Sequence, residues 1–302
     1  MRQEVSTART RELGHELRRV RKRAGYSGTE MARMLGWGVP KVSRLESGQR
    51  EVLPTEITDY LARARATPEE LAELVALASG AHNHRLQCHA AGQPDALRTL
   101  TLLEARCTSI TTYCPDLVPA LLQTDAYIQA VLRRYGHTTG PEFDAAVAAR
   151  VKRQKAVFTR HSRPTLALYV YEDALCTTFD DPTVMYEQLL HLQLSSELPH
   201  CRIRVVPASN GTFDSRHDFT IFRHEVDQPV LHVDALTASL FLEDDTEIAF
   251  YQEFLNQVDA AALDRHESRE WLANRTQELE PKTHVLHARR WPSDSRLVHL
   301  PR

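Results

Sequence analysis

Residues 27–48, SGTEMARMLGWGVPKVSRLESG, constrain the fold more than any other stretch, because local signals divide them into two short helices. Ser27 with Glu30 three positions later forms a capping-box pattern, which predicts a helix that begins there and ends at Gly36. Pro40 suits the first turn of a following helix, which ends at Gly48. Two short helices joined by a turn of a few residues predict helix-turn-helix geometry, in which the second helix enters the major groove of DNA.

The flanking residues extend this pair into a helical domain over residues 1–80. Leu13, Leu17 and Val20 recur at helical spacing between residues 12 and 24, and basic residues fill the other faces of that first helix. Further helices are expected at 55–65 and at 67–78. The sequence therefore predicts a mainly α head of five short helices.

Charge is divided unevenly along the 302 residues. The first 50 contain 12 Lys or Arg and 5 Asp or Glu, a net charge of +7, which leaves −10 for residues 51–302 out of the total of −3. A basic head on an acidic body indicates that the head alone meets a polyanion. The alternative is a solvated cationic helix in an ordinary bundle.

The predicted second helix of the pair supplies the candidate DNA contacts. Lys41 and Arg44 lie three residues apart on its exposed face and can donate to guanine, and Val39 can touch a thymine methyl. The expected base contacts are Val39, Pro40, Lys41 and Arg44; the expected phosphate contacts are Trp37, Gly38, Ser43, Ser47, Gln49 and Arg50. Because one such head covers few base pairs, we expect a homodimer on an inverted repeat.

The head resembles the Xre family of lambda-repressor-like regulators. The residues that carry this resemblance are Leu17-Arg18, Arg21, Gly25, Ser27, Ala32, Gly36, Val42-Ser43, Glu46 and Gly48. It implies a lambda-repressor-like bundle and a structural ion pair between Arg21 and Glu46. Two departures are Gly28, where relatives usually have a phosphate-contacting Gln, and Val39-Pro40, where relatives often present polar side chains.

The rest of the chain predicts a linker, a body and a tail. Residues 81–98 are polar and rich in small residues, which marks a linker; within it His82, His84, Cys88 and His89 match no standard zinc spacing. Residues 99–277 alternate helical patterns with strand-like runs, and the late strands follow one another, which favours an α+β domain with a mixed or partly antiparallel sheet. Residues 278–302 have no clear period and predict a loosely ordered tail.

The body resembles the C-terminal domain of unknown function of many actinobacterial regulators, including the WhiJ type of developmental control. The matching stretches are 117–132, 147–154, 171–175, 184–192, 203–207 and 267–272, and Ala120 stands where relatives usually have Gly. The resemblance implies a transcriptional regulator, expected to be a repressor, whose body binds a small regulatory protein. Control by a small-molecule ligand in the body is the alternative.

Enzymatic and metal chemistry are not indicated. GxSxG, HExxH and P-loop motifs are absent, so we expect no enzyme, catalytic residue, cofactor or metal. An enzyme targeted to DNA stays a further alternative; its acid–base candidates are Glu172-Asp173, Arg150 with Arg153, and Asp214 with His217 and Asp218. Five scattered cysteines and the absence of a long apolar run predict a cytoplasmic, nucleoid-associated protein with reduced thiols and no membrane partner.

Overall fold

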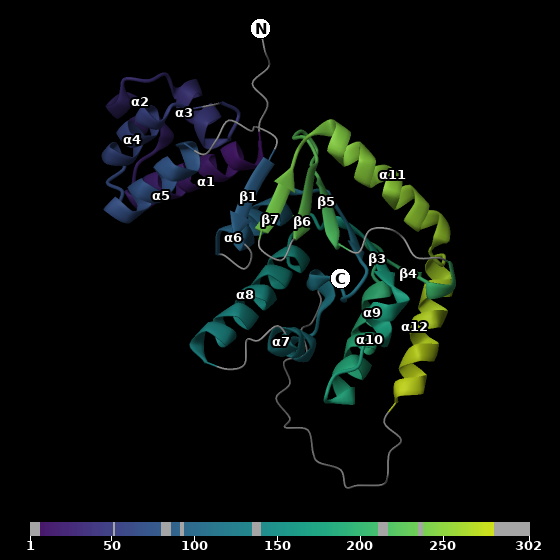
Figure 1. Cartoon of the computed structure of the whole chain (residues 1–302). Coiled ribbons are helices and arrows are strands. Elements are labelled where there is room, and N and C mark those ends of the chain that lie inside the picture. Colours follow the sequence, from purple (N-terminus) through teal and green to yellow (C-terminus); the bar gives the residue numbers. More distant parts are fainter. Residues whose placement is uncertain are drawn as a thin grey trace.

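A helical head lies beside a body built on one sheet (Figure 1). The computed structural model describes residues 7–50, 52–79, 86–90, 94–134, 140–210, 217–234 and 238–280. Most of the predicted tail and the histidines 82 and 84 lie outside the described residues, and so do the side chains of residues 88 and 89.

The head consists of five helices, as predicted. They are α1 (Ala8–Arg23), α2 (Gly28–Leu35), α3 (Val39–Glu46), α4 (Pro54–Arg63) and α5 (Pro68–Ser79). The capping box at Ser27 is formed, and Gly36 ends α2 with a φ of 66°, a left-handed conformation that suits glycine. Helix α1 begins four residues earlier than predicted, because Thr7 and Thr10 form a reciprocal cap there.

The helices of the head enclose one apolar core. Leu17, Val20, Met31, Ile57 and Tyr60 are fully buried in it, and they come from α1, α2 and α4. The apolar spacing that predicted the first helix therefore places its buried face correctly.

The body contains a mixed seven-stranded sheet within an α+β domain. Its strands are β1 (Leu86–Ala90), β2 (Ser109–Cys114), β3 (Thr165–Tyr171), β4 (Cys201–Val206), β5 (Phe219–Arg223), β6 (Val230–Asp234) and β7 (Ala238–Leu242), in the spatial order β1-β7-β6-β5-β2-β3-β4. Strands β2, β3 and β4 run parallel, whereas β5, β6, β7 and β1 pair antiparallel. The prediction of a partly antiparallel sheet is confirmed.

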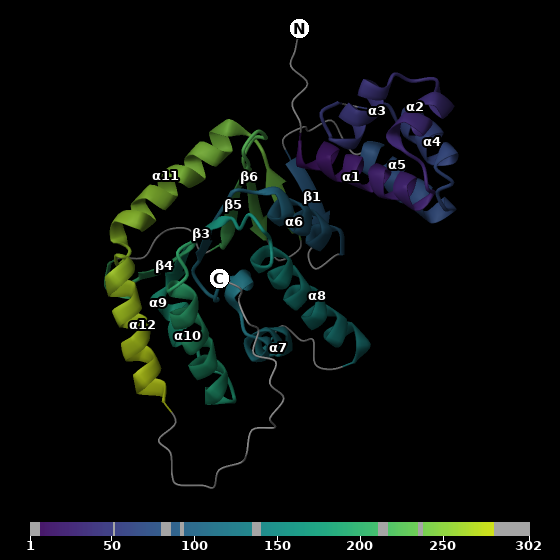
Figure 2. The ribbon, with the colours of Figure 1, turned by 180° about the vertical axis from the view of Figure 1, so that it is seen from behind.

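Helices cover both faces of this sheet (Figures 1 and 2). They are α6 (Pro94–Arg106), α7 (Asp125–Arg134), α8 (Pro141–Phe158), α9 (Glu172–Cys176), α10 (Pro182–Ser196), α11 (Asp245–Ala261) and α12 (Arg265–Leu279), with short 3-10 turns η1 (Ala120–Leu122) and η2 (Ala208–Asn210). Helix α11 packs against Tyr113 and Phe219 on one face. Ile110 and Phe222 belong to the core on the opposite face, because successive side chains of a strand alternate.

The segment predicted to be a linker differs from that expectation in part. Residues 86–90 form β1, which pairs with β7 at the edge of the sheet, and α6 begins at Pro94. The small polar composition gave no period-2 signal, so the pairing with a strand about 150 residues away was invisible locally.

The first turn of α1 is attached to the body by a buried carboxylate. Both carboxylate oxygens of Glu243, next to β7, accept from the backbone N–H of Ala8 at 2.8 Å, and one accepts from Arg11 at 2.9 Å. Burial raises the pKa of Glu243, although Arg11 opposes this. A second link joins α1 to α6, where the hydroxyl of Thr99 donates to Glu12 at 2.8 Å. The head and the body are thus joined through specific polar contacts.

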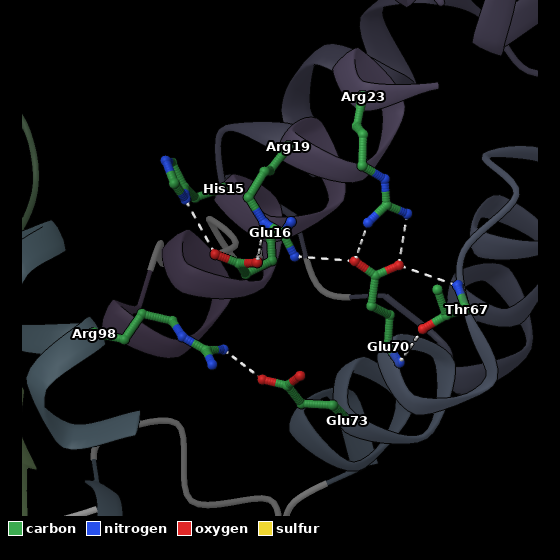
Figure 3. A network of polar contacts seen from close by, with 8 residues as sticks. All are labelled: His15, Glu16, Arg19, Arg23, Thr67, Glu70, Glu73 and Arg98. Atoms are coloured by element: carbon green, nitrogen blue, oxygen red, sulfur yellow. Dashed lines mark hydrogen bonds and ion pairs between the residues drawn. The ribbon is translucent and has the colours of Figure 1, made fainter. Parts of the chain in front are cut away.

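A network of ion pairs also connects α1, α5 and α6 (Figure 3). Glu70 accepts from Arg23 at 2.7 Å and from Arg19 at 3.3 Å, and Glu16 accepts from Arg19 at 2.7 Å. The hydrogen bond to His15, with further contributions from Arg19, lowers the pKa of Glu16 to about 2. The hydrogen bond to Arg23 lowers that of Glu70 to about 2 as well.

These lowered pKa values predict acid sensitivity of the head. A carboxylate whose pKa is lower in the folded than in the unfolded chain stabilises the fold. This stabilisation is fully present above about pH 4.5, the ordinary pKa, and is lost as the pH falls toward the folded-state pKa of about 2. Urea unfolding of the full chain at several pH values between these limits measures the loss. Glu70→Gln should show a shallower dependence than the unmodified chain; parallel curves for the two proteins would contradict the assignment.

Candidate DNA-binding surface

The α2–α3 pair presents a helix with one buried and one exposed side. Val42 and Leu45 of α3 are buried in the head core. The tight turn from Gly36 to Gly38 orients α3, and the N–H of Trp37 donates to the carbonyl of Ala32 at 2.9 Å. The residues of α3 that do not pack are therefore held in a fixed direction on the surface of the domain.

Three of the four predicted base-contact residues stand on this exposed side. Val39 is 47% exposed, and Pro40 and Arg44 are exposed as well. Within the part of the chain that the structure describes, the guanidinium of Arg44 forms no ion pair or hydrogen bond. Arg44 is thus the cation of α3 that is available to a ligand without displacing a protein partner.

Lys41 differs from the prediction, because an acidic residue holds it. Its Nζ lies 2.6 Å from Oε1 of Glu56 on α4 and 3.8 Å from the centroid of the Trp37 ring. Arg50 reaches the same Oε1 at 3.2 Å. Burial raises the pKa of Glu56, but the hydrogen bond from Lys41 and the charge of Arg50 outweigh this and hold it below the ordinary value. Two predicted DNA-contacting cations therefore share one carboxylate in the free protein.

The other predicted phosphate contacts border α3. Gly38 is its N-cap and supplies no side-chain cap, and helix N-termini of this kind attract phosphate. Ser43 and Gln49 are exposed, whereas the hydroxyl of Ser47 donates to the carbonyl of Arg44 at 3.1 Å. Trp37 is half-buried beneath Lys41, so its ring supports the surface more than it forms it.

An ion pair of low exposure braces α3 against α1. Arg21 donates to both carboxylate oxygens of Glu46 at 2.6 and 2.7 Å, and each side chain is 8% exposed. The Tyr60 hydroxyl donates to Glu46 at 2.7 Å, and burial followed by this carboxylate raises the pKa of Tyr60. The pair that the family resemblance implied is present, and it fixes three helices relative to one another.

Close backbone contact also sets the position of α3. A Cβ at Gly14 of α1 would lie 2.6 Å from the carbonyl oxygen of Leu45, and one at Gly48 would lie 2.5 Å from the backbone nitrogen of Arg11. Gly48 also has a φ of 72°. Helix α1 and the C-terminal end of α3 approach this closely only because neither Gly14 nor Gly48 carries a side chain.

The acidic residue that contacts this surface, Glu56, was not predicted from the sequence. Glu56 follows α3 by ten positions on another helix, and no local pattern distinguishes it from a solvated helix-start carboxylate. The charge pattern was a partial signal. Residues 51–80 contain 2 basic and 6 acidic residues, so the net charge falls from +7 over residues 1–50 to +3 over residues 1–80. The head is therefore less uniformly basic than its first 50 residues.

Comparison with known proteins identifies both parts of the chain. The model of a helix-turn-helix domain matches residues 12–75. The head is therefore a helix-turn-helix domain, a class whose function is DNA binding.

The body defines the family. The model described as a domain of unknown function, DUF5753, matches residues 97–274, which is more than half of the chain. The protein belongs to the DUF5753 family.

Two further comparisons add little. No curated protein shows significant similarity to the chain. Among solved structures, that of TrmBL2, described as an archaeal chromatin protein with a novel mode of DNA binding, matches at 14% identity and a TM-score of 0.29. The match covers 70% of this chain and 66% of that one, just under two thirds of its length. A TM-score this low does not establish a shared fold.

Metal and membrane signals are weak within the described ranges. No group of three or more His, Cys, Asp or Glu side chains there is placed to hold a metal ion. No described helix is long and apolar enough to cross a membrane.

Proposed function

We propose that this protein is a sequence-specific DNA-binding repressor in which α3 reads the major groove. The observation that carries the proposal is the exposed face of α3, where Val39, Pro40 and Arg44 stand clear of the protein on a helix braced by Arg21 and Glu46. The helix-turn-helix match supports the same placement. Selection of bound sequences from random duplexes by the full chain tests it, because failure to enrich any sequence is incompatible with base readout.

Arg44→Ala should weaken binding to the selected site by about 1 to 3 kcal/mol and relax the base preference at one position, as expected for a guanine contact. Fluorescence anisotropy on the selected duplex and on random DNA measures both effects. Arg202→Ala removes the same charge from the exposed side of β4 in the body and is the matched control. An equal loss on both duplexes would identify Arg44 as a phosphate contact instead.

Glu56→Gln should strengthen DNA binding by roughly two- to fivefold, the range expected for a partly exposed ion pair. The substitution keeps the shape of the side chain but releases Lys41 and Arg50 from a shared carboxylate. Asp59→Asn, at an exposed position one turn along α4, controls for the change in net charge. If both variants gain equally, bulk charge rather than the Lys41 contact determines the effect.

One such head covers only a few base pairs. We propose a homodimer on an inverted repeat, with half-site centres about 34 Å apart or a multiple of that distance. Light scattering of the free and DNA-bound chain tests this; a monomer in both states would refute it.

The body is proposed to bind a small regulatory protein. With +3 over residues 1–80 out of a total of −3, residues 81–302 carry a net charge of −6, which supports an indirect role because such a body repels phosphate. Full-length protein should capture a partner that changes operator affinity, and operator DNA should change partner affinity by the same factor. A captured protein without that reciprocity would exclude coupling between body and head.

A further inference from the structure

The face of the sheet that packs against α6 and α8 carries polar side chains in two adjacent rows. The strand register pairs Thr112 of β2 with Thr220 of β5, and Thr220 with His232 of β6, so these three form one row across three strands. The next row lies where the strands end, at Cys114, Asp218 and Asp234. On this face the neighbouring row of Ile110, Phe222 and Val230 is apolar and buried.

These rows line a cavity of about 80 Å³. Leu100 and Glu104 of α6, Arg153 of α8 and the η1 turn complete its wall. Glu104 accepts from Nε of Arg153 at 2.8 Å through both oxygens, so these two charges satisfy each other. Two polar rows thus lie beside the apolar row, at a depth where a sheet normally packs through apolar side chains.

The floor of the cavity has hydrogen-bonding capacity left over. His232 is 6% exposed, and its Nε2 forms no hydrogen bond with another described residue; the nearest carboxylate oxygen, Oδ1 of Asp234, lies 3.3 Å away. Among the described residues, the hydroxyls of Thr112 and Thr220 bond to each other and to no other side chain, at 3.1 Å between their oxygens. Buried polar groups without good partners are unfavourable, which indicates that something else completes them.

The charged groups around the cavity indicate which class of ligand would complete these polar groups. Once Glu104 and Arg153 are paired, the remaining charged groups of the lining are the carboxylates of Asp218 and Asp234. Asp234 already accepts from the hydroxyl of Ser239 and is attracted by Arg150 and Arg153, whereas the carboxylate of Asp218 forms no ion pair with another described residue. The floor adds hydroxyl oxygens and an imidazole nitrogen, which can accept hydrogen bonds. The site therefore favours a cation that donates from nitrogen.

We propose that this cavity binds the primary ammonium end of a small aliphatic amine. A single water molecule requires about 10 to 15 Å³ of such cavity volume, so the cavity has room for an ammonium group with a short aliphatic chain. The ammonium lies against Thr220 and His232, and the rest of the chain leaves between Asp218 and Asp234. This inference concerns the body alone and does not depend on DNA binding by the head.

Calorimetric titration of the full chain with 1,4-diaminobutane at physiological salt tests the proposal. We expect saturable binding to one site per chain, weakened about five- to tenfold by Asp218→Asn, the size expected for a partly exposed charge pair. The carboxylate of Asp218 forms no hydrogen bond or ion pair with another described side chain, so Asp218→Asn breaks no such contact and keeps the shape of the side chain. Asp180→Asn, an exposed carboxylate before α10, is the matched control and should leave the affinity unchanged.

A second readout locates the amine. The imidazole signals of His232, identified by their loss in His232→Gln, should shift during the NMR titration in proportion to occupancy, and sodium acetate should leave them unmoved. Absence of saturable binding would overturn the proposal. Equal affinities of Asp218→Asn and Asp180→Asn would do so too, because they would show general attraction to an acidic body.

Discussion

Replacing Glu46 by alanine should destabilise the head by about 3 to 5 kcal/mol, the cost of removing one partner from an ion pair held away from water. The change strands the Arg21 guanidinium at 8% exposure and removes the acceptor of the Tyr60 hydroxyl. Chemical denaturation of the full chain, followed by circular dichroism, measures the loss. DNA binding should fail at temperatures where the variant head is unfolded.

The control for Glu46→Ala is a Glu–Arg ion pair that is largely exposed to solvent. Glu73→Ala breaks the pair with Arg98, which has side chains 46% and 32% exposed, and should change stability by no more than about 1 kcal/mol. Replacing Arg21 and Glu46 together by apolar residues should recover much of the loss, because no charge is then left buried. Similar losses for Glu46→Ala and Glu73→Ala would show that burial of the first pair is energetically unimportant.

Gly14→Ala should destabilise the head by about 1 to 3 kcal/mol and also weaken DNA binding. Alanine favours a helix over glycine by about 1 kcal/mol, but here its Cβ would press on the carbonyl oxygens of Leu45 and Glu46 at 2.6 and 2.7 Å. Relief of that contact requires α3 to move away from α1, which displaces the side chains proposed to read DNA. Thermal unfolding and anisotropy together report both effects.

Gly28→Ala is the matched control on the neighbouring helix. A Cβ there meets nothing within 4 Å, and the backbone is in an ordinary helical conformation. Its stability should stay the same or rise by up to about 1 kcal/mol. If Gly14→Ala also proves neutral, the two helices are less closely packed than the structure shows.

The sequence predicted those parts of the fold that local signals determine. Ser27, Glu30 and Gly36 define α2 through backbone hydrogen bonds within a few residues, and so the predicted helix agrees with the observed one. Helix α1 was placed too late, because its capping box uses Thr10 where the usual pattern has Glu or Gln. Strands β1, β2 and β7 were not predicted, because short runs gain their pairing from distant strands.

The candidate site was predictable only as a face of a helix. The spacing of Val42 and Leu45 placed Arg44 outward, which the structure shows. The partner of Lys41 was not predictable, because the contact with Glu56 depends on how α4 packs across the core. The polar rows of the body were hidden for the same reason: Thr112, Thr220 and His232 belong to three strands whose register no local pattern reveals.

The contact between Ala8 and Glu243 has a consequence for biosynthesis. The two residues are separated by 235 positions, so the ribosome completes the head long before it adds the carboxylate that binds the first turn of α1. At usual rates of about 5 to 20 residues per second, this interval lasts roughly 10 to 50 s. During that time the head can form its own core, but the backbone N–H of Ala8 lacks the carboxylate that accepts from it. Each newly made chain thus passes through a stage in which a helix-turn-helix domain exists before Glu243, which attaches its first helix to the body, has been made.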